Sequence, residues 1–192
     1  MRPEDQRPRV GPRAVVVGAP CAGKSTLARS LAAKLGAPHV ELDALYWEPG
    51  WQPAERTSFR SRVEAATRGS RWVLDGNYRE TRDIVWARAT DVVWLDVSLP
   101  TVLWRVARRS WRRWRSRELL WGTNRESFWK QLRPTDESLL WWALRTHRRR
   151  RREYARAASG AAFPHLRWTR LRSGKDIARW LESVEPDEAS VT

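Results

Sequence analysis

The stretch Gly18-Ala19-Pro20-Cys21-Ala22-Gly23-Lys24-Ser25-Thr26 fits the pattern G-x-x-x-x-G-K-[ST]. The apolar run Ala14-Val15-Val16-Val17 precedes it, and leucines follow at helical spacing, at Leu27, Leu31 and Leu35. These flanks predict a strand before the loop and a helix after it, the order that phosphate binding requires. The alternative is a glycine-rich turn that matches by accident, and the flanking elements argue against it.

The residue types of this loop suit a phosphate group. Gly18 and Gly23 let the backbone turn closely, so that several amide N–H groups can face one anion at a helix N-terminus. Lys24 would place an ammonium on the β- and γ-phosphates, and the Ser25 hydroxyl would complete the oxygen ligands of a Mg²⁺ ion. We therefore expect ATP and Mg²⁺ as cofactors, with the nucleotide held by Gly18, Ala19, Cys21, Ala22, Gly23, Lys24, Ser25 and Thr26.

Apolar strands alternate with helical patterns along the rest of the chain. The sequence predicts strands at 14–18, 38–43, 71–75, 91–97 and 166–171. It predicts helices at 24–35, within 53–68, near 79–88, from 100 to about 114, from about 137 to 158, and after 171. Such alternation is typical of an α/β fold, a parallel sheet covered by helices on both faces. Ligands of such sheets bind beyond the carboxyl ends of the strands.

Composition limits the class of protein. A chain of 192 residues suits one domain, which we expect at 13–184 between disordered tails at 1–12 and 185–192. No apolar run approaches the ~18 residues of a membrane span, and the first residues lack the apolar middle of a signal peptide. We therefore expect a cytoplasmic protein with no membrane contact. The single cysteine, Cys21, cannot form an internal disulfide.

Aspartates close several of the predicted strands. Asp75 ends the apolar run Trp72-Val73-Leu74. An aspartate in this position has the form of the carboxylate that holds Mg²⁺ opposite a phosphate loop. Gly76 and Asn77 follow it; the glycine allows close backbone approach, and the asparagine offers a donor and an acceptor to a second substrate. The alternative is a tight turn, which these residues also favour, but the phosphate loop that precedes them at suitable spacing favours the functional interpretation.

Asp43 is expected at the end of the second strand, beside Tyr46 and Trp47. Its carboxylate could accept a proton from a docked acceptor, or it could simply cap a helix or turn. Asp96 lies before the end of its strand, and we expect it to anchor a neighbouring loop rather than to act in catalysis.

Arginines dominate the second half of the chain. Arg105 and Arg109 lie four residues apart on one predicted helix and lead into a stretch at about 108–134 that lacks clear periodicity. Arginines on a closing segment stabilise the negative charge of a transferring phosphoryl group, so we expect a lid carrying these two side chains. A solvated basic helix face is the alternative.

A run of arginines at 148–152 covers every direction of a helix. Arg145, Arg148 and Arg152 share one stripe, and Arg148 is our candidate for contact with a substrate phosphate. A basic surface for nucleic acid at 145–152 competes with that interpretation, since the net charge is +15 and favours polyanions. Base composition of the genome is a third explanation, because only four of the 37 basic residues are lysines. The histidines lack metal-ligand company, so no zinc site is expected.

Taken together, these motifs resemble the adenylate-kinase-like branch of P-loop kinases, most closely the bacterial topology modulation proteins and the adenylate-kinase-like proteins grouped with them. The marks are the loop at 18–26, Leu42 to Trp47, Trp72 to Tyr78, Trp94 to Asp96, the helix of Arg105 and Arg109, and Gly122 to Ser127. The resemblance implies a three-layer P-loop NTPase fold, a five-stranded parallel sheet in the order 2-3-1-4-5, and a helical, Arg-rich lid.

The resemblance also implies site residues. Adenylate kinases carry Asp-Gly-Phe-Pro-Arg where this chain has Asp75 to Arg79, so Asp75 would serve Mg²⁺ and Arg79 an acceptor phosphate. This chain lacks that proline, and nothing near Asp43 corresponds to the Thr-Gly-Asp segment that receives AMP. A small hydroxyl or phosphate acceptor held by Asp43 and Asn77 is equally compatible.

The resulting hypothesis is an ATP-dependent kinase that moves the γ-phosphate of ATP to a small acceptor. Lys24, Arg105, Arg109 and Asp43 are its candidate catalytic residues, Ser25 and Asp75 its metal ligands, and Asp43, Gly76, Asn77, Arg79 and Arg148 its substrate contacts. The alternative is a nucleic-acid-associated protein that uses ATP slowly or as a switch.

Overall fold

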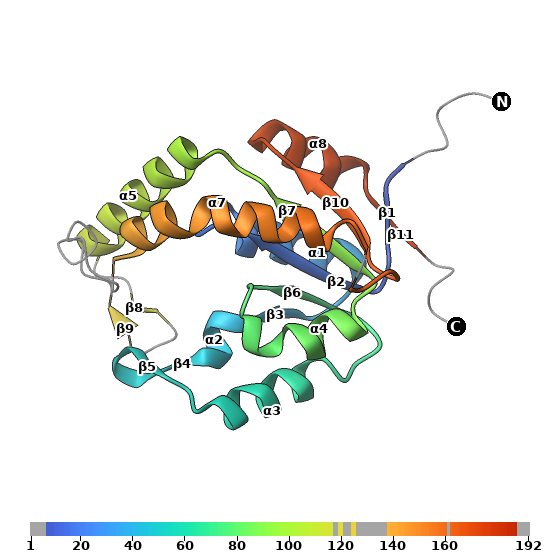
Figure 1. Ribbon diagram of the computed structural model, residues 1–192, viewed down its shortest axis with the longest axis horizontal. Helices are drawn as coiled ribbons and strands as arrows, with labels where there is room; N and C mark the ends of the chain where they lie inside the picture. The colour runs from blue at the N-terminus through green and yellow to red at the C-terminus, as the bar shows by residue number, and fades with distance from the viewer. Residues whose placement is uncertain (1–6, 117–118, 121–123, 126–137, 161, 188–192) are drawn as a thin grey trace.

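A parallel sheet of five strands forms the centre of the protein (Figure 1). The computed structural model describes residues 7–116, 119–120, 124–125, 138–160 and 162–187. Across the sheet the strands follow the order β3 (His39–Glu41), β6 (Trp72–Asp75), β2 (Arg13–Gly18), β7 (Asp91–Leu95) and β10 (Arg167–Leu171). All neighbouring pairs run parallel. The predicted order 2-3-1-4-5 and the α/β fold class are therefore confirmed.

Helices cover both faces of the sheet, because successive side chains of a strand point to opposite sides. Ala14 and Val16 of β2 pack with α1 (Lys24–Leu35), α5 (Leu99–Ser116) and α8 (Gly174–Ser183). Val15 and Val17 pack on the other side with α3 (Arg56–Ala66) and α4 (Arg82–Arg88). The predicted helix at 24–35 coincides with α1.

The helix α7 (Leu139–Ala157) lies across the edge of the sheet where β7 ends. Its Ala143 belongs to the apolar cluster on one face of the sheet and its Tyr154 to the cluster on the other. The ring Nε2 of His147, between them, lies 3.0 Å from the carbonyl oxygen of Val97, just beyond β7. Figure 1 shows α7 running beside α5. This path brings α7 to the edge at which ligands of parallel sheets bind.

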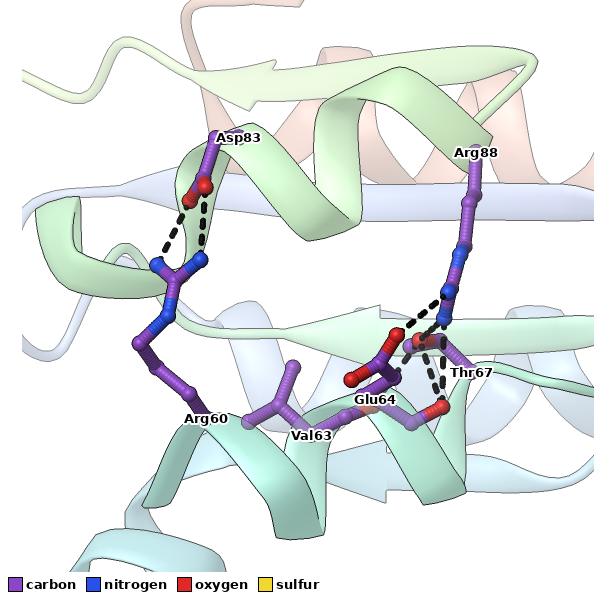
Figure 2. A network of polar contacts seen from close by, with 6 residues as sticks. All are labelled: Arg60, Val63, Glu64, Thr67, Asp83 and Arg88. Carbon is purple, nitrogen blue, oxygen red and sulfur yellow. Dashed lines mark hydrogen bonds and ion pairs between the residues drawn. The ribbon is translucent and has the colours of Figure 1, made fainter. Parts of the chain in front are cut away.

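Two arginine-centred contacts hold α3 against α4 (Figure 2). Arg60 donates both terminal nitrogens to the Asp83 carboxylate, at 2.9 and 2.7 Å. Arg88 donates to the Glu64 carboxylate at 3.1 Å and to the Thr67 hydroxyl at 3.0 Å. Beneath these contacts, the fully buried Phe59 and Val63 of α3 pack against the core. These contacts therefore brace α3 and α4 against each other on one face of the sheet.

The strand expected at 38–43 ends earlier, at Glu41. Its pairing with β6 stops there, and a one-turn helix, α2 (Leu42–Tyr46), begins because Leu42 turns into the core and is 2% exposed. A small hairpin follows, made of β4 (Trp47–Glu48), a 3-10 turn (Pro49–Trp51) and β5 (Gln52–Pro53). After β6, the 3-10 turn η3 (Arg79–Thr81) leads into α4. Asp43 therefore lies in the first turn of a helix, not at the end of a strand.

The two ends of the described chain pair with each other. β1 (Arg9–Val10) runs parallel to β11 (Glu185–Pro186), within segments that we expected to be disordered tails. Val10 is 2% exposed, and the backbone N–H of Gly11 donates to the Asp91 carboxylate at 2.8 Å. Proline and charge content suggested tails, but these contacts fix residues 9–11 against the sheet.

The helix α5 is longer than its predicted form. It continues to Ser116, so residues 108–116 are helical, and two-residue strands β8 (Leu119–Leu120) and β9 (Asn124–Arg125) form a further small pair. The rest of the lid predicted at 108–134 lies outside the described residues, as do several residues of the 122–127 motif. Within the part of the chain that the structure describes, no helix has the length and apolar character needed to cross a membrane.

Candidate active site

The loop between β2 and α1 has the backbone geometry that its sequence predicts. Gly23, the residue before α1, has φ 102°, and Gly18 has φ 154°. A β-carbon on Gly18 would lie 2.7 Å from the carbonyl oxygen of Leu95, so no larger residue fits there. Cys21 also adopts a positive φ, 54°, which is uncommon for a residue with a side chain. The loop therefore turns tightly before the first turn of α1, where unpaired backbone amides favour an anion.

Lys24 folds back over this loop. Its ammonium donates a hydrogen bond to the Ala19 carbonyl oxygen at 3.1 Å. Burial lowers the pKa of Lys24 below its ordinary value, and the nearby carboxylates of Asp43 and Asp75 act in the opposite direction. The ammonium thus lies over the loop, within electrostatic range of the Asp43 and Asp75 carboxylates.

Asp75 lies at the carboxyl end of β6 and is 2% exposed. The hydroxyl of Ser25 donates to its Oδ1 at 3.3 Å, and its Oδ2 lies 2.8 Å from Nε2 of His39. A hydroxyl and a carboxylate are the oxygen donors that Mg²⁺ prefers, and this ion needs only one or two protein carboxylates because it keeps several waters. Ser25 and Asp75 therefore fit the magnesium ion expected beside the loop.

His39 is a site residue that the sequence did not reveal. No other potential metal ligand lies near His39 in the sequence, so the sequence predicts no site there. In the structure, β3 pairs with β6 and brings the His39 ring to the Asp75 carboxylate. The signal that could have identified it is the neighbouring order of the second and third predicted strands. The other histidines bind carbonyl oxygens, His147 that of Val97 and His165 that of Trp86.

Asp43 contacts Tyr78, a residue from the segment after β6. The Tyr78 hydroxyl donates to Oδ1 of Asp43 at 2.7 Å. Burial raises the pKa of Tyr78, and the Asp43 charge raises it further, so this hydroxyl stays protonated. An aromatic group surrounds the pair: the Tyr46 ring centroid lies 4.5 Å from that of Tyr78, 5.0 Å from that of Phe59 and 4.9 Å from that of Trp47. Asp43 thus places a carboxylate beside a group of aromatic rings.

Gly76 and Asn77 connect the two halves of the site. Gly76 has φ 132°, and a β-carbon there would lie 2.7 Å from Cβ of Leu42, so this glycine allows β6 and α2 to pack closely. The side-chain Nδ2 of Asn77 is buried without a hydrogen-bond partner. Both residues were candidates for substrate contact; the structure gives Gly76 a packing role and Asn77 a donor that is still available.

Of the two candidate lid arginines, Arg105 contacts the loop. Its guanidinium donates to the carbonyl oxygen of Ala22 at 2.9 Å. Arg109, one turn along α5, has a buried Nε without a partner, and no hydrogen bond joins it to the loop among the described residues. Arg105 is thus in place beside the phosphate loop, whereas a role for Arg109 remains a prediction.

The structure does not bring Arg79 and Arg148 into the site. Arg79 has a side chain that is 76% exposed and lies 3.5 Å from Glu153. Arg148 is exposed on α7, whereas Arg150 on the same helix is half-buried and its charge lowers the pKa of Lys24. The arginine of this run that faces the loop is therefore Arg150. The inward face of α7 is the one that carries His147, whereas Arg145, Arg148 and Arg152 lie on an exposed face.

Asp96 anchors neighbouring elements, as expected. Its carboxylate binds Arg170 of β10, at 2.5 Å, and Arg151 of α7, at 3.1 Å. These ion pairs attach α7 to the end of β7, close to the phosphate loop. Within the described residues, no group of three or more His, Cys, Asp or Glu side chains is placed to hold a metal ion.

Comparisons with solved structures show a shared fold. A gluconokinase from Sinorhizobium meliloti 1021 is 17% identical, with a TM-score of 0.54 over 91% of this chain and 90% of its own. A shikimate kinase from Bacteroides thetaiotaomicron is 15% identical, with a TM-score of 0.53 over 88% of this chain and 94% of its own. A shikimate kinase from Acinetobacter baumannii in complex with shikimate is 20% identical, with a TM-score of 0.50 over 89% of each chain. No curated protein matches the chain.

A family model described as an AAA domain matches residues 13–109, about half of the chain. The match covers the phosphate loop, both aspartates of the site and the first part of α5, which includes Arg105. The protein therefore belongs to the AAA domain family, with a P-loop fold shared by small-molecule kinases.

Proposed function

We propose that the protein is an ATP-dependent phosphotransferase that moves the γ-phosphate of ATP to a hydroxyl group of a small acceptor. The observation that carries this proposal is the position of Lys24, whose ammonium is hydrogen-bonded to the phosphate loop and whose pKa is lowered by burial while the charges of Asp43 and Asp75 act to raise it. One carboxylate is paired with the Ser25 hydroxyl, and the other faces the acceptor side. Lys24 thus lies between a half of the site that would bind ATP and a half that would bind the acceptor.

In the donor half, the loop amides and Lys24 bind the β- and γ-phosphates of ATP. Ser25 and Asp75 would hold Mg²⁺, which supplies positive charge against the phosphate oxygens and fixes their orientation. Arg105 is already hydrogen-bonded to the loop, and Arg109 would add a second guanidinium when the lid closes. Phosphoryl transfer needs little covalent chemistry from the protein, so this positioning and charge supply most of the catalysis.

In the acceptor half, Asp43 accepts the proton of the attacking hydroxyl. Its Oδ1 binds Tyr78, which leaves the second oxygen for a substrate, and Asn77 offers an unused amide donor. The fold shared with a gluconokinase and with shikimate kinases supports a small acceptor that carries a hydroxyl group. The adenylate-kinase-like resemblance would give Arg79 to the phosphate of AMP, but the exposure of that side chain and its proximity to Glu153 favour a hydroxyl acceptor.

The direct test uses ATP labelled in its γ-phosphate, incubated with Mg²⁺ and a panel of small polyols, sugars, hydroxy acids and nucleosides. We expect label to move to one class of acceptor. Lys24→Ala should abolish the transfer, and Lys175→Ala, a change of the same kind at an exposed lysine of α8, should leave it intact. Transfer that persists in Lys24→Ala, or label released only as phosphate for every acceptor, contradicts the proposal.

Nucleic-acid binding is a second candidate, favoured by the outward side of α7. Arg148, Arg149 and Arg152 are exposed there. Binding of this kind weakens steeply with salt, is insensitive to Lys24→Ala, and is lost when these arginines are neutralised. Salt-dependent retention of DNA or RNA with those properties would favour it. Both candidates use ATP and are compatible with a cytoplasmic location.

A further inference from the structure

The inward face of α7 is defined by residues at helical spacing. Ala143 and Tyr154 are buried at the two ends of this face, and the His147 ring contacts the Val97 carbonyl between them. Arg150 follows His147 by three residues and precedes Tyr154 by four, so it lies on the same face. Ion pairs fix the helix on either side of it: Arg151 to Asp96 at 3.1 Å, and Glu153 to Arg82 at 2.6 Å. The direction of Arg150 is therefore set by the packing of the helix.

Arg150 carries a charge that no carboxylate neutralises directly. Its guanidinium carbon lies 4.2 Å from the centroid of the Trp142 ring, and no hydrogen bond or ion pair joins the group to another described residue. Glu153, the one acid of α7, is committed to Arg82 and Arg79. Burial lowers the pKa of Arg150, and its charge reaches Lys24. Two cations thus face one region, an arrangement that an anion between them would stabilise.

Two further donors lie near this face of α7: Tyr154, four residues after Arg150, and Asn77, whose amide lies beside the Tyr154 hydroxyl. The Nδ2 of Asn77 is buried and has no partner. Tyr154 is 2% exposed; burial raises its pKa, and Arg150, Arg82 and the Asn77 amide act against that rise. Both groups can donate a hydrogen bond. Although they are neighbours, the Asn77 Nδ2 makes no hydrogen bond of normal geometry, and no hydrogen bond donated by the Tyr154 hydroxyl is found among the described residues. Buried donors are normally satisfied, so this group lacks an acceptor atom that a ligand would supply.

We propose that Arg150, Asn77 and Tyr154 form an oxyanion site, which binds a phosphate or carboxylate oxygen on the acceptor side of the phosphate loop. The inference rests on the proposed function and makes it more specific. The oxyanion has two possible sources with the same chemistry. It is either the phosphoryl group in transfer or an anionic group of the acceptor itself. In both cases a planar guanidinium that is stacked on Trp142 meets the ligand in a fixed orientation.

The test compares Arg150→Met with Arg148→Met, which removes the same charge from an exposed position of the same helix. Titration calorimetry is carried out with three probes in the presence of Mg²⁺: ADP, the non-hydrolysable ATP analogue AMP-PNP, and sulfate added to protein saturated with AMP-PNP. If the site binds the transferring phosphate, Arg150→Met weakens AMP-PNP by about 10- to 100-fold, the loss typical of a charge-assisted hydrogen bond, and spares ADP. If the site binds an anionic group of the acceptor, Arg150→Met loses only the binding of sulfate to the protein saturated with AMP-PNP.

Equal affinities of Arg150→Met and the wild type for all three probes overturn the proposal, and so does an equal loss in Arg148→Met. Asn77→Leu provides a second variant with no change of charge, and it should weaken the same probe as Arg150→Met. Arg150→Lys serves if the methionine variant does not fold, because it keeps the charge but loses the planar fork. Should the wild type bind no AMP-PNP at all, the proposed function fails instead, and sulfate titrated alone still tests the oxyanion site.

Discussion

The Nε2 atom of His39 lies 2.8 Å from Oδ2 of Asp75, on the same carboxylate whose Oδ1 accepts from the Ser25 hydroxyl. The histidine thereby holds a buried carboxylate in the orientation that faces the phosphate loop. Residues that orient a metal ligand in this way change metal affinity by about 10- to 100-fold when they are removed.

His39→Ala should therefore raise the Mg²⁺ concentration needed for half-maximal ATP binding by about 10- to 100-fold. ATP binding without Mg²⁺ should change little, because Lys24 and the loop amides are untouched. Calorimetric titration of ATP at a series of Mg²⁺ concentrations measures both quantities. His165→Ala, far from the site at the Trp86 carbonyl, is the control. An unchanged Mg²⁺ requirement in His39→Ala would show that this contact does not orient Asp75.

Asp43→Asn should lower the rate of phosphoryl transfer by about 10²- to 10⁴-fold, the usual contribution of a positioned general base. The substitution keeps an oxygen that can accept from Tyr78 and removes only the charge. ATP affinity should stay within a few-fold of the wild-type value. Steady-state rates with the acceptor found in the labelling panel measure the effect. Transfer at the wild-type rate would exclude Asp43 as the base.

Gly76→Ala should destabilise the protein by about 1–3 kcal/mol, because the new β-carbon would lie 2.7 Å from Cβ of Leu42 in a backbone conformation of positive φ. The free energy of unfolding in urea measures this cost. Gly69→Ala is the matched control, since a β-carbon there meets nothing closer than 3.6 Å. Leu42 begins α2, the helix that carries Asp43. A shift of Leu42 that relieves the clash would also move Asp43, so the transfer rate should fall. Equal unfolding free energies for the two variants would contradict the packing role.

Glu55→Gln should lower stability in a pH-dependent way. The Glu55 carboxylate caps α3 by accepting from the backbone N–H groups of Thr57 and Ser58, each at 3.0 Å. Hydrogen bonds, first that of the Thr57 side chain, lower the pKa of Glu55 to about 2. A carboxyl group whose pKa falls on folding stabilises the protein above its unfolded pKa of 4.5, and loses that effect as the pH falls toward 2.

Urea unfolding curves of the wild type and Glu55→Gln should therefore differ by a constant amount above about pH 5 and converge between pH 4.5 and 2. A difference that does not change over this interval would show that the charge of Glu55 plays no part in capping α3.

The sequence predicted the parts of the fold that local patterns determine. The β2–loop–α1 unit follows from one motif, and its helix has the predicted bounds because glycines precede and follow it, at Gly23 and Gly36. The order of the sheet was predicted from resemblance, and the strand pairings confirm it. A motif such as this loop predicts local structure well because its residue types suit the backbone conformation of each position.

What the sequence could not predict depends on contacts between distant segments. The strand expected to reach Asp43 ends at Glu41, because Leu42 packs beneath Gly76 from another strand. The run at 148–152 gave no indication of its inward face, since every position is arginine and only the anchoring of His147 on Val97 selects Arg150. The site roles of Lys24, Ser25, Asp43 and Asp75 remain predictions that the geometry supports.

The most direct measurement of the central claim is calorimetric titration of ATP with Mg²⁺ into the folded protein and into Lys24→Ala. The account predicts saturable binding to the wild type with one nucleotide per chain, and loss of that binding in the variant while its thermal unfolding remains cooperative. Absence of binding to the well-folded wild type, or equal affinities of the two proteins, would contradict it.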